Sequence, residues 1–233
     1  HTTAYQSVSE IKRLFEDPDS IQLGNYDEHW QENNKQKNMY VSSNFTVPKF
    51  MQSVVKPSPA EVGTATHLLL QEVPLDHKPE VGDVVGMLQR LVADKVVTPE
   101  IADLIQTQEV INVFDSELGL QMLAHPERIH REAPFSMLMD ANLVFPGFNA
   151  DSPEKILIHG IIDGYIELDD EVILFDYKTD YVPNDSDRSI DKAVKKYKGQ
   201  INLYAKALEN ILHKPVTDKF IYLLSINKPV KIK

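Results

Sequence analysis

The residues whose types and spacing best suit hydrolytic chemistry are Asp163, Asp176 and Lys178. One residue separates Asp176 from Lys178, so on a β-strand their side chains project from the same face. Carboxylate oxygens are the ligands that Mg²⁺ prefers, and a bound Mg²⁺ polarises a phosphodiester and activates water. A lysine beside such a site neutralises charge in the transition state. The alternative for this spacing is a plain Asp176–Lys178 salt bridge on an exposed strand.

The elements that must position these residues are two apolar runs joined by a short acidic turn. The runs cover residues 156–162 and 172–175, and a pair of aspartates marks the turn between them. Such runs predict a β-hairpin that brings Asp163 towards Asp176. Because Asp176 directly follows the second run, its charge is expected to be buried and compensated, which favours a functional site over an exposed salt bridge.

The rest of the C-terminal half is predicted to build a sheet around this hairpin. Apolar and amphipathic patterns predict strands over residues 129–137, 143–148, 219–226 and 230–232, and a long helix over 189–212. Pro134 places the first of these strands at an edge or a bulge. Together with the helices expected upstream, this order predicts an α/β fold with a mixed sheet and helices on both faces.

The N-terminal half is predicted to be mainly helical. Capping residues and helical spacing predict helices over 8–16, 59–75, 80–93, Thr98–Val110 and Ser116–Leu123. A polar segment over 24–47, which contains the only tryptophan, Trp30, is predicted to be a long loop. His67 lies near the middle of the second helix, where Gly63 allows another backbone to approach. On the residues alone, such a histidine is more often packed in the core than bound to a metal.

Three further polar residues are candidates for the same site. Glu132 is an acid on a predicted strand, and the alternative is an exposed carboxylate beside Arg131. Gln200 and Tyr204 are four residues apart and therefore share one face of the long helix, where a core position is the alternative for Tyr204. The same helix carries lysines that either contact phosphate or form a solvated face, namely Lys192, Lys195, Lys196 and Lys198.

Composition excludes several classes of function. The 233 residues include 35 acidic and 24 basic ones, and the net charge of −11 argues against a free-standing nucleic-acid binder. It does not exclude a catalytic module that other domains supply with nucleic acid. The absence of cysteine excludes disulfides, thiolate metal sites and a cysteine nucleophile. No apolar run approaches the roughly 20 residues of a membrane helix, the start lacks a secretory signal, and P-loop, G-x-S-x-G and H-E-x-x-H motifs are absent.

Five short motifs resemble those of one nuclease family. They are G-x-x-x-H at Gly63–His67, R-E-x-P-F at Arg131–Phe135, G-x-x-D at Gly160–Asp163, D-Y-K-T-D at Asp176–Asp180 and Q-x-x-x-Y at Gln200–Tyr204. The set resembles the RecB-family nuclease domains of the PD-(D/E)XK superfamily, and most closely those of the AddA (RexA) group of helicase–nucleases. The resemblance covers nearly the whole chain.

The resemblance implies a role for each candidate residue. The metal ligands would be His67, Asp163, Asp176 and the backbone carbonyl of Tyr177. Lys178 would be the catalytic lysine, and Glu132, Gln200 and Tyr204 would complete the active site. It also implies a restriction-endonuclease-like core over residues 126–233, a helical elaboration over 1–125, and a single nuclease domain that is a C-terminal piece of a longer chain.

The resemblance further implies the reaction and its partners. The expected activity is a Mg²⁺-dependent DNA exonuclease, whose site Mn²⁺ or Ca²⁺ also occupies, acting on unwound single strands during double-strand-break repair. The expected partners are helicase domains upstream in the same chain and an AddB (RexB)-type subunit in a bacterial cytoplasm, with no membrane. The alternatives are a non-catalytic DNA-binding or interaction domain of the same fold, and another superfamily nuclease such as a restriction enzyme or phage exonuclease.

Overall fold

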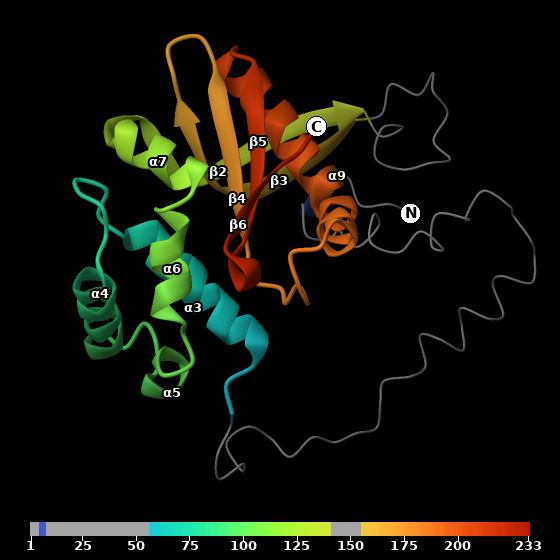
Figure 1. Cartoon of the computed structure of the whole chain (residues 1–233). Helices are drawn as coiled ribbons and strands as arrows, with labels where there is room; N and C mark the ends of the chain where they lie inside the picture. Colours follow the sequence, from blue (N-terminus) through green and yellow to red (C-terminus); the bar gives the residue numbers. More distant parts are fainter. Residues whose placement is uncertain (1–4, 8–55, 141–154) are drawn as a thin grey trace, which may run out of the picture.

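The computed structural model describes residues 5–7, 56–140 and 155–233, and the description below refers to these residues (Figure 1). The predictions for the helix over 8–16, the loop with Trp30 and the apolar run over 143–148 lie outside them. The described residues form a mixed sheet with helices on both faces (Figure 1), so the predicted α/β fold is confirmed. Within the described residues, no helix is both long and apolar enough to cross a membrane.

The sheet has six strands in the order β1-β3-β4-β5-β6, and β2 pairs with β3. The strand bounds are β1 Tyr5–Ser7, β2 Ile129–Asp140, β3 Lys155–Glu167, β4 Val172–Lys178, β5 Val216–Leu223 and β6 Lys228–Lys231. The predicted hairpin is confirmed as the antiparallel pair β3–β4, whose turn is closed by a 2.9 Å hydrogen bond from Leu168 N–H to the Glu171 carbonyl. Pro134 lies on β2, which pairs only with β3 among the described strands, as expected for an edge strand.

The helices are α3 Pro59–Glu72, α4 Val81–Ala93, α5 Pro99–Ala102, α6 Thr107–Val113, α7 Glu117–Ala124 and α9 Asp187–Leu212. Ser58 and Glu61 form a capping box that fixes the start of α3, with Pro59 in its first turn. The prediction of one helix from Thr98 to Val110 is wrong, because α5 and α6 are separate. Leu104 and Ile105 lie in the turn between them, where their N–H groups bond back to Ile101 and Ala102.

Each face of the sheet carries its own hydrophobic core. One core joins α9 to the sheet through Val172 and Leu174 of β4, and the other joins α3–α7 to it through Ile173, Phe175 and Tyr177. This alternation is the two-residue period of a strand that is buried on both faces. Asp176 and Lys178 continue the series that faces α9, so β4 directs its polar residues and its aromatic residues to opposite sides.

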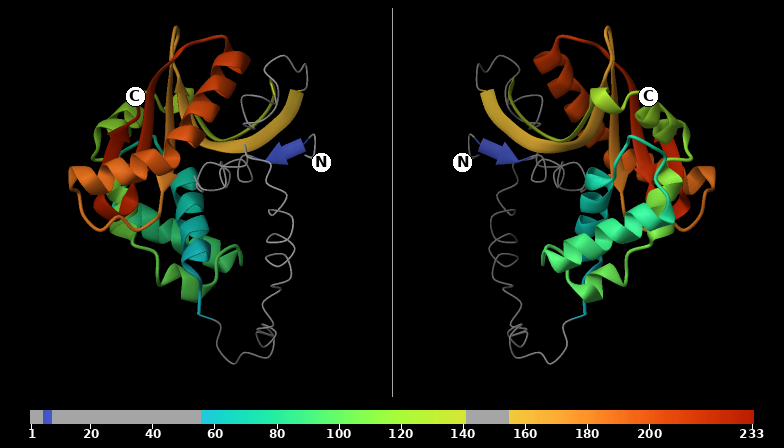
Figure 2. Two further views of the ribbon diagram at one scale, coloured as in Figure 1. Left: turned by 90° about the vertical axis from the view of Figure 1, so that its right-hand side faces the viewer. Right: turned by 90° about the vertical axis from the view of Figure 1, so that its left-hand side faces the viewer.

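Strand β3 bends so that it has two partners along one edge (Figure 2). β2 pairs with β3 along nearly its full length, while the other edge pairs with β1 at Leu157–His159 and with β4 at Gly164–Glu167. Residues 160–163 therefore have no strand partner on that edge in the described part of the chain. This interruption lies beside the end of β4, and it leaves room for side chains instead of ladder hydrogen bonds.

Candidate active site

The carboxylate of Asp176 and the ammonium group of Lys178 form a buried ion pair on β4. The distance from Lys178 Nζ to Asp176 Oδ2 is 2.6 Å, and the two side chains are 11% and 2% exposed. Lys178 Nζ also donates a 3.0 Å hydrogen bond to Gln200 Oε1 of α9. The prediction that Asp176 is buried and compensated is confirmed, and an exposed salt bridge is excluded because burial makes this pair far more costly to maintain.

Asp163 lies at the point where the β3–β4 ladder ends. The last paired residues are Gly164 and Phe175, and Asp163 and Asp176 occupy the next position on each strand. In place of a backbone bond, the N–H of Tyr177 donates a 2.8 Å hydrogen bond to Asp163 Oδ2. The hairpin thus brings both aspartates together, as the sequence predicts.

His67 reaches the same point from α3. Its Nδ1 atom lies 3.3 Å from Asp163 Oδ2, and its ring stands edge-on to Tyr177 with the ring centroids 6.2 Å apart. Gly63, one turn earlier, explains how the helix comes so close: a Cβ atom there would lie only 2.7 Å from Thr179 Oγ1, just beyond β4. The contact with Asp163 shows that His67 is not simply a packed core histidine.

Glu132 is placed beside Asp163 on the other neighbouring strand. The pairs Arg131–Gly164 and Ala133–Ile162 put Glu132 opposite Asp163 in the β2–β3 register. Its φ of 50° is in the left-handed region, which non-glycine residues rarely adopt and which is found at functional sites. Burial and the nearby charge of Asp163 raise the pKa of the Glu132 carboxyl. The positions of Glu132, Asp163 and Asp176 therefore form one row across three strands.

Gln200 and Tyr204 extend the site on α9, and a third residue of this helix joins them. Gln200 Nε2 donates a 2.8 Å hydrogen bond to the Tyr204 hydroxyl, and the buried Tyr204 ring packs edge-on against Phe135. Tyr197, which the sequence indicates only as part of the apolar face of this helix, lies with its ring centroid 4.4 Å from Lys178 Nζ. Its spacing of three residues before Gln200 is the one signal in the sequence for this role.

The charges at the site oppose one another. Burial and the charge of Asp163 raise the pKa of the Asp176 carboxyl, against the attraction of Lys178 and His67. At His67 burial lowers the pKa, but the hydrogen bond with Asp163 and the charges of Asp163 and Asp176 outweigh it, and the net shift is upwards. Two carboxylates held together in a buried place create a demand for positive charge.

The donor set is suited to a divalent cation, although the side chains are not arranged as a finished cage. Within the described residues, no group of three or more His, Cys, Asp or Glu side chains is placed to hold a metal ion. However, Asp176 Oδ2 is buried and accepts no hydrogen bond with regular angles, and its one close partner is the ammonium of Lys178. Carboxylate oxygens left free in this way are typical ligands of hard cations, with waters completing the shell.

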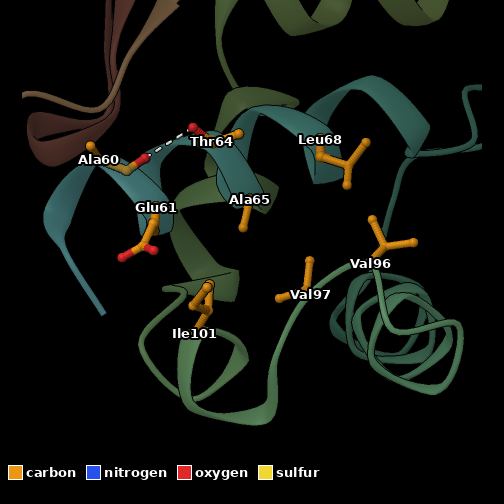
Figure 3. A pocket seen from close by; sticks show the side chains of 8 residues that line it. All are labelled: Ala60, Glu61, Thr64, Ala65, Leu68, Val96, Val97 and Ile101. Atoms are coloured by element: carbon orange, nitrogen blue, oxygen red, sulfur yellow. Dashed lines mark hydrogen bonds between the residues drawn. The ribbon is translucent and has the colours of Figure 1, made fainter. Parts of the chain in front are cut away.

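A separate pocket of about 400 Å³ lies on a different side of α3 (Figure 3). Its lining is mostly aliphatic, from Ala65 and Leu68 on the helix to Val96, Val97 and Ile101 below it (Figure 3). The polar groups there are engaged in the helix itself: the Thr64 hydroxyl donates to the Ala60 carbonyl, and Glu61 belongs to the capping box. This pocket offers no acid–base pair, so the chemistry belongs to the cluster at the end of β4.

Comparison with known proteins agrees with this arrangement. Residues 41–231 match the family model of the PD-(D/E)XK nuclease superfamily. A protein of Pediococcus pentosaceus is 44% identical over 233 residues, which cover 100% of this chain and 19% of that protein. A protein of Ligilactobacillus salivarius is 44% identical over 98% of this chain and 18% of its own length, and one of Enterococcus faecalis is 42% identical over 96% and 18%.

All three relatives are named as the first of the subunits of an ATP-dependent helicase/nuclease. The chain spans about a fifth of the length of these curated relatives. The similarity therefore concerns the part of those proteins that corresponds to this fold, and the identity is high enough to extend along the entire chain, including the helical block that carries His67.

Proposed function

The chain belongs to the PD-(D/E)XK nuclease superfamily, and on that premise we propose that it is the metal-dependent DNA nuclease domain of a longer ATP-dependent helicase–nuclease. The observation that carries the proposal is the convergence of His67, Asp163, Asp176 and Lys178 at the end of β4. We further propose Mg²⁺ as the natural metal, with Mn²⁺ or Ca²⁺ able to take its place, and exonucleolytic cutting of unwound single strands as the reaction.

In this proposal the metal would be held by His67, Asp163, Asp176 and the backbone carbonyl of Tyr177. A divalent cation there supplies Lewis-acid polarisation of the scissile phosphate and makes water a better nucleophile. The chain keeps this donor set in place through the Tyr177 N–H bond to Asp163. Because hydrogen bonds to a ligand's second oxygen fix its orientation, this contact aligns the carboxylate before any metal arrives.

Lys178 is the proposed catalytic lysine. Its Nζ is held between Asp176 and Gln200, at 2.6 Å and 3.0 Å, and against the ring of Tyr197. A cation fixed in this way stabilises the negative charge that develops on the phosphate oxygens, and it does so without moving during the reaction. Glu132 and Tyr204 are proposed to complete the site, Glu132 as an accessory acid and Tyr204 as the group that orients Gln200.

The wider setting follows from the relatives' name. We propose that helicase domains lie upstream in the same chain, that a second subunit of the AddB (RexB) type joins them, and that the assembly processes broken DNA in a bacterial cytoplasm. Residues 1–233 would form one nuclease domain, with residues 126–233 as its catalytic core. A motor that threads single strands to this domain explains how a module of net charge −11 acts on DNA.

The test is cleavage of end-labelled single-stranded DNA by the chain with Mg²⁺, with Mn²⁺ and with chelator. Wild type is expected to shorten the strand only with metal, Asp176→Ala and Lys178→Ala are expected to be inactive, and the exposed-site controls Asp170→Asn and Lys206→Ala are expected to match wild type. Cleavage that survives in both active-site variants would refute the assignment. Binding without cleavage in any metal would favour a non-catalytic DNA-binding domain of the same fold.

A further inference from the structure

We propose that a basic groove along the first half of α9 is a subsite that binds the single strand next to the cleaved phosphate. The groove has a volume of about 910 Å³ and lies between α9, the segment over residues 180–183 and Leu223 at the end of β5. This inference rests on the proposed nuclease function, since it extends the same active site to more of the substrate.

The groove shares a wall with the active site. Tyr197 lines the groove and is itself buried, and its ring lies between two ammonium groups: Lys178 Nζ at 4.4 Å and Lys196 Nζ at 5.0 Å from the ring centroid. Lys178 belongs to the catalytic cluster, and Lys196 belongs to the groove. A strand whose phosphate lies at Lys178 therefore meets the groove within one side chain's thickness.

The groove concentrates positive charge in an otherwise acidic chain. Arg188, Lys192 and Lys195 line it and are exposed, and among the described residues none of the three makes an ion pair. They follow one another at intervals of four and three residues, which places them along one face of α9 over roughly 10 Å. The single acid in the lining, Asp180, is already paired with Lys196 at 2.8 Å. The acids Asp187 and Asp191 of α9 are not part of the lining.

This charge pattern fits the phosphate backbone of nucleic acid. Three cations in a line, without carboxylate partners, neutralise successive phosphates and release condensed counterions. A solvated helix face is the plain alternative for such residues, but it does not account for their convergence on a groove that leads to the catalytic lysine. Lys198 and Lys206 show the contrast, because both are exposed on the same helix and neither lines the groove.

Tyr181 identifies the strand as single rather than paired. Its side chain is 80% exposed, which is unusual for a tyrosine, and it lines the groove beside the cations. An exposed aromatic ring next to a basic track is the arrangement on which unpaired bases stack, whereas the bases of a duplex are already stacked on each other. The groove thus supplies both elements of sequence-independent single-strand binding.

The experiment compares two double variants that remove the same charge from the same helix. Lys192→Gln with Lys195→Gln alters the groove, and Lys198→Gln with Lys206→Gln is the matched control. The readouts are kcat and KM on a single strand of on the order of 30 nucleotides, longer than typical single-strand site sizes, over a range of salt, and on bis(p-nitrophenyl) phosphate, which is too small to reach the groove.

The groove variant is expected to raise KM for the long strand on the order of tenfold at about 0.1 M salt, and to flatten the log KM against log salt slope by about 1.4, from about 0.7 per phosphate contact. Its kcat and its activity on the small ester are expected to match wild type. Tyr181→Ala is expected to raise KM for the single strand by about fivefold or more, with a smaller effect on duplex.

The outcomes separate this inference from the proposed function. If wild type cleaves DNA and the groove variant behaves like its matched control, the subsite is refuted while the nuclease stands. An equal effect of Tyr181→Ala on single and double strands refutes the single-strand assignment. If wild type does not cleave, the same variants are compared by fluorescence anisotropy of a labelled single strand, and equal affinity of the groove variant and its control refutes the subsite.

Discussion

Replacing the buried carboxylate of Asp176 by an amide is expected to stabilise the metal-free protein while abolishing cleavage. The Asp176 side chain is almost fully buried, and burial together with Asp163 raises the pKa of its carboxyl to about 6 from an ordinary value of 3.8. The difference between these two pKa values corresponds to roughly 3 kcal/mol by which the ionised group destabilises the fold at neutral pH. The attraction of Lys178 is already part of that balance. Asp176→Asn should therefore gain about 1–3 kcal/mol.

The sign of the pH dependence follows from the direction of the shift. The folded protein holds this proton more tightly than the unfolded chain does, so the contribution to stability is complete below about pH 4 and is lost as the pH rises through about 6. The variant has no such proton. Its advantage over wild type should therefore be absent at about pH 4 and at its largest above about pH 7.

The assay is thermal unfolding in chelator at several pH values, followed by the same scan with Mg²⁺. For a chain of this size, about 1 kcal/mol corresponds to roughly 2–4 °C in Tm. Mg²⁺ should raise the Tm of wild type more than that of Asp176→Asn, which removes one proposed ligand. Asp170→Asn, at the exposed hairpin turn, is the control and should change stability by less than about 0.5 kcal/mol. A metal-free Asp176→Asn that is less stable than wild type at about pH 7.5 would refute this electrostatic account.

Three other substitutions test how the site is held. Gly63→Ala should push α3 away from Thr179 and weaken metal binding in calorimetry, with recovery when Thr179→Ala is added, whereas Gly86→Ala has open space and should be neutral or stabilising by up to about 1 kcal/mol; unchanged metal affinity in Gly63→Ala would contradict the close-approach argument. Arg131→Ala removes the donor to the carbonyls of Leu70 and Val73 at the end of α3 and should cost about 1.5–3 kcal/mol in urea unfolding; a loss below about 0.5 kcal/mol would mean that water replaces this cap. Gln200→Leu frees Lys178 from its 3.0 Å hydrogen bond and should lower kcat about tenfold at unchanged KM, and a pure KM effect would assign Gln200 to substrate binding instead.

Local pattern was sufficient for the elements at the centre of the fold. The β3–β4 hairpin was predictable because its apolar runs and acidic turn are adjacent in the sequence, and the spacing of Asp176 and Lys178 determined their common face. The division between α5 and α6 was not predictable, because apolar residues continue at helical spacing through the turn at Leu104 and Ile105. The apolar run predicted as one strand over 219–226 likewise ends as β5 at Leu223 and continues as a 3₁₀ turn.

The parts of the site that sequence alone left open depend on contacts between distant elements. His67 and Asp163 lie far apart in the chain, and only the approach of Gly63 to Thr179 makes their contact possible. The left-handed conformation of Glu132 is set by its place between strands and has no signature in its neighbours. The motif resemblance indicated these residues, but it could not supply their geometry.

The two-sided burial of β4 explains why the site tolerates its opposing charges. Tyr177 points away from the acids into the core formed with α3–α7, where its hydroxyl contacts Met122 Sδ at 3.7 Å, and its backbone N–H is thereby held against Asp163. Asp176 and Lys178 point to the opposite side, where α9 supplies Gln200 and Tyr197. Since burial of apolar side chains contributes about 25 cal/mol per Å², the aromatic residues on both faces offset the several kcal/mol by which crowded carboxylates destabilise this strand end. The helical block is therefore part of the active site's construction, because it both carries His67 and anchors the strand that bears the catalytic pair.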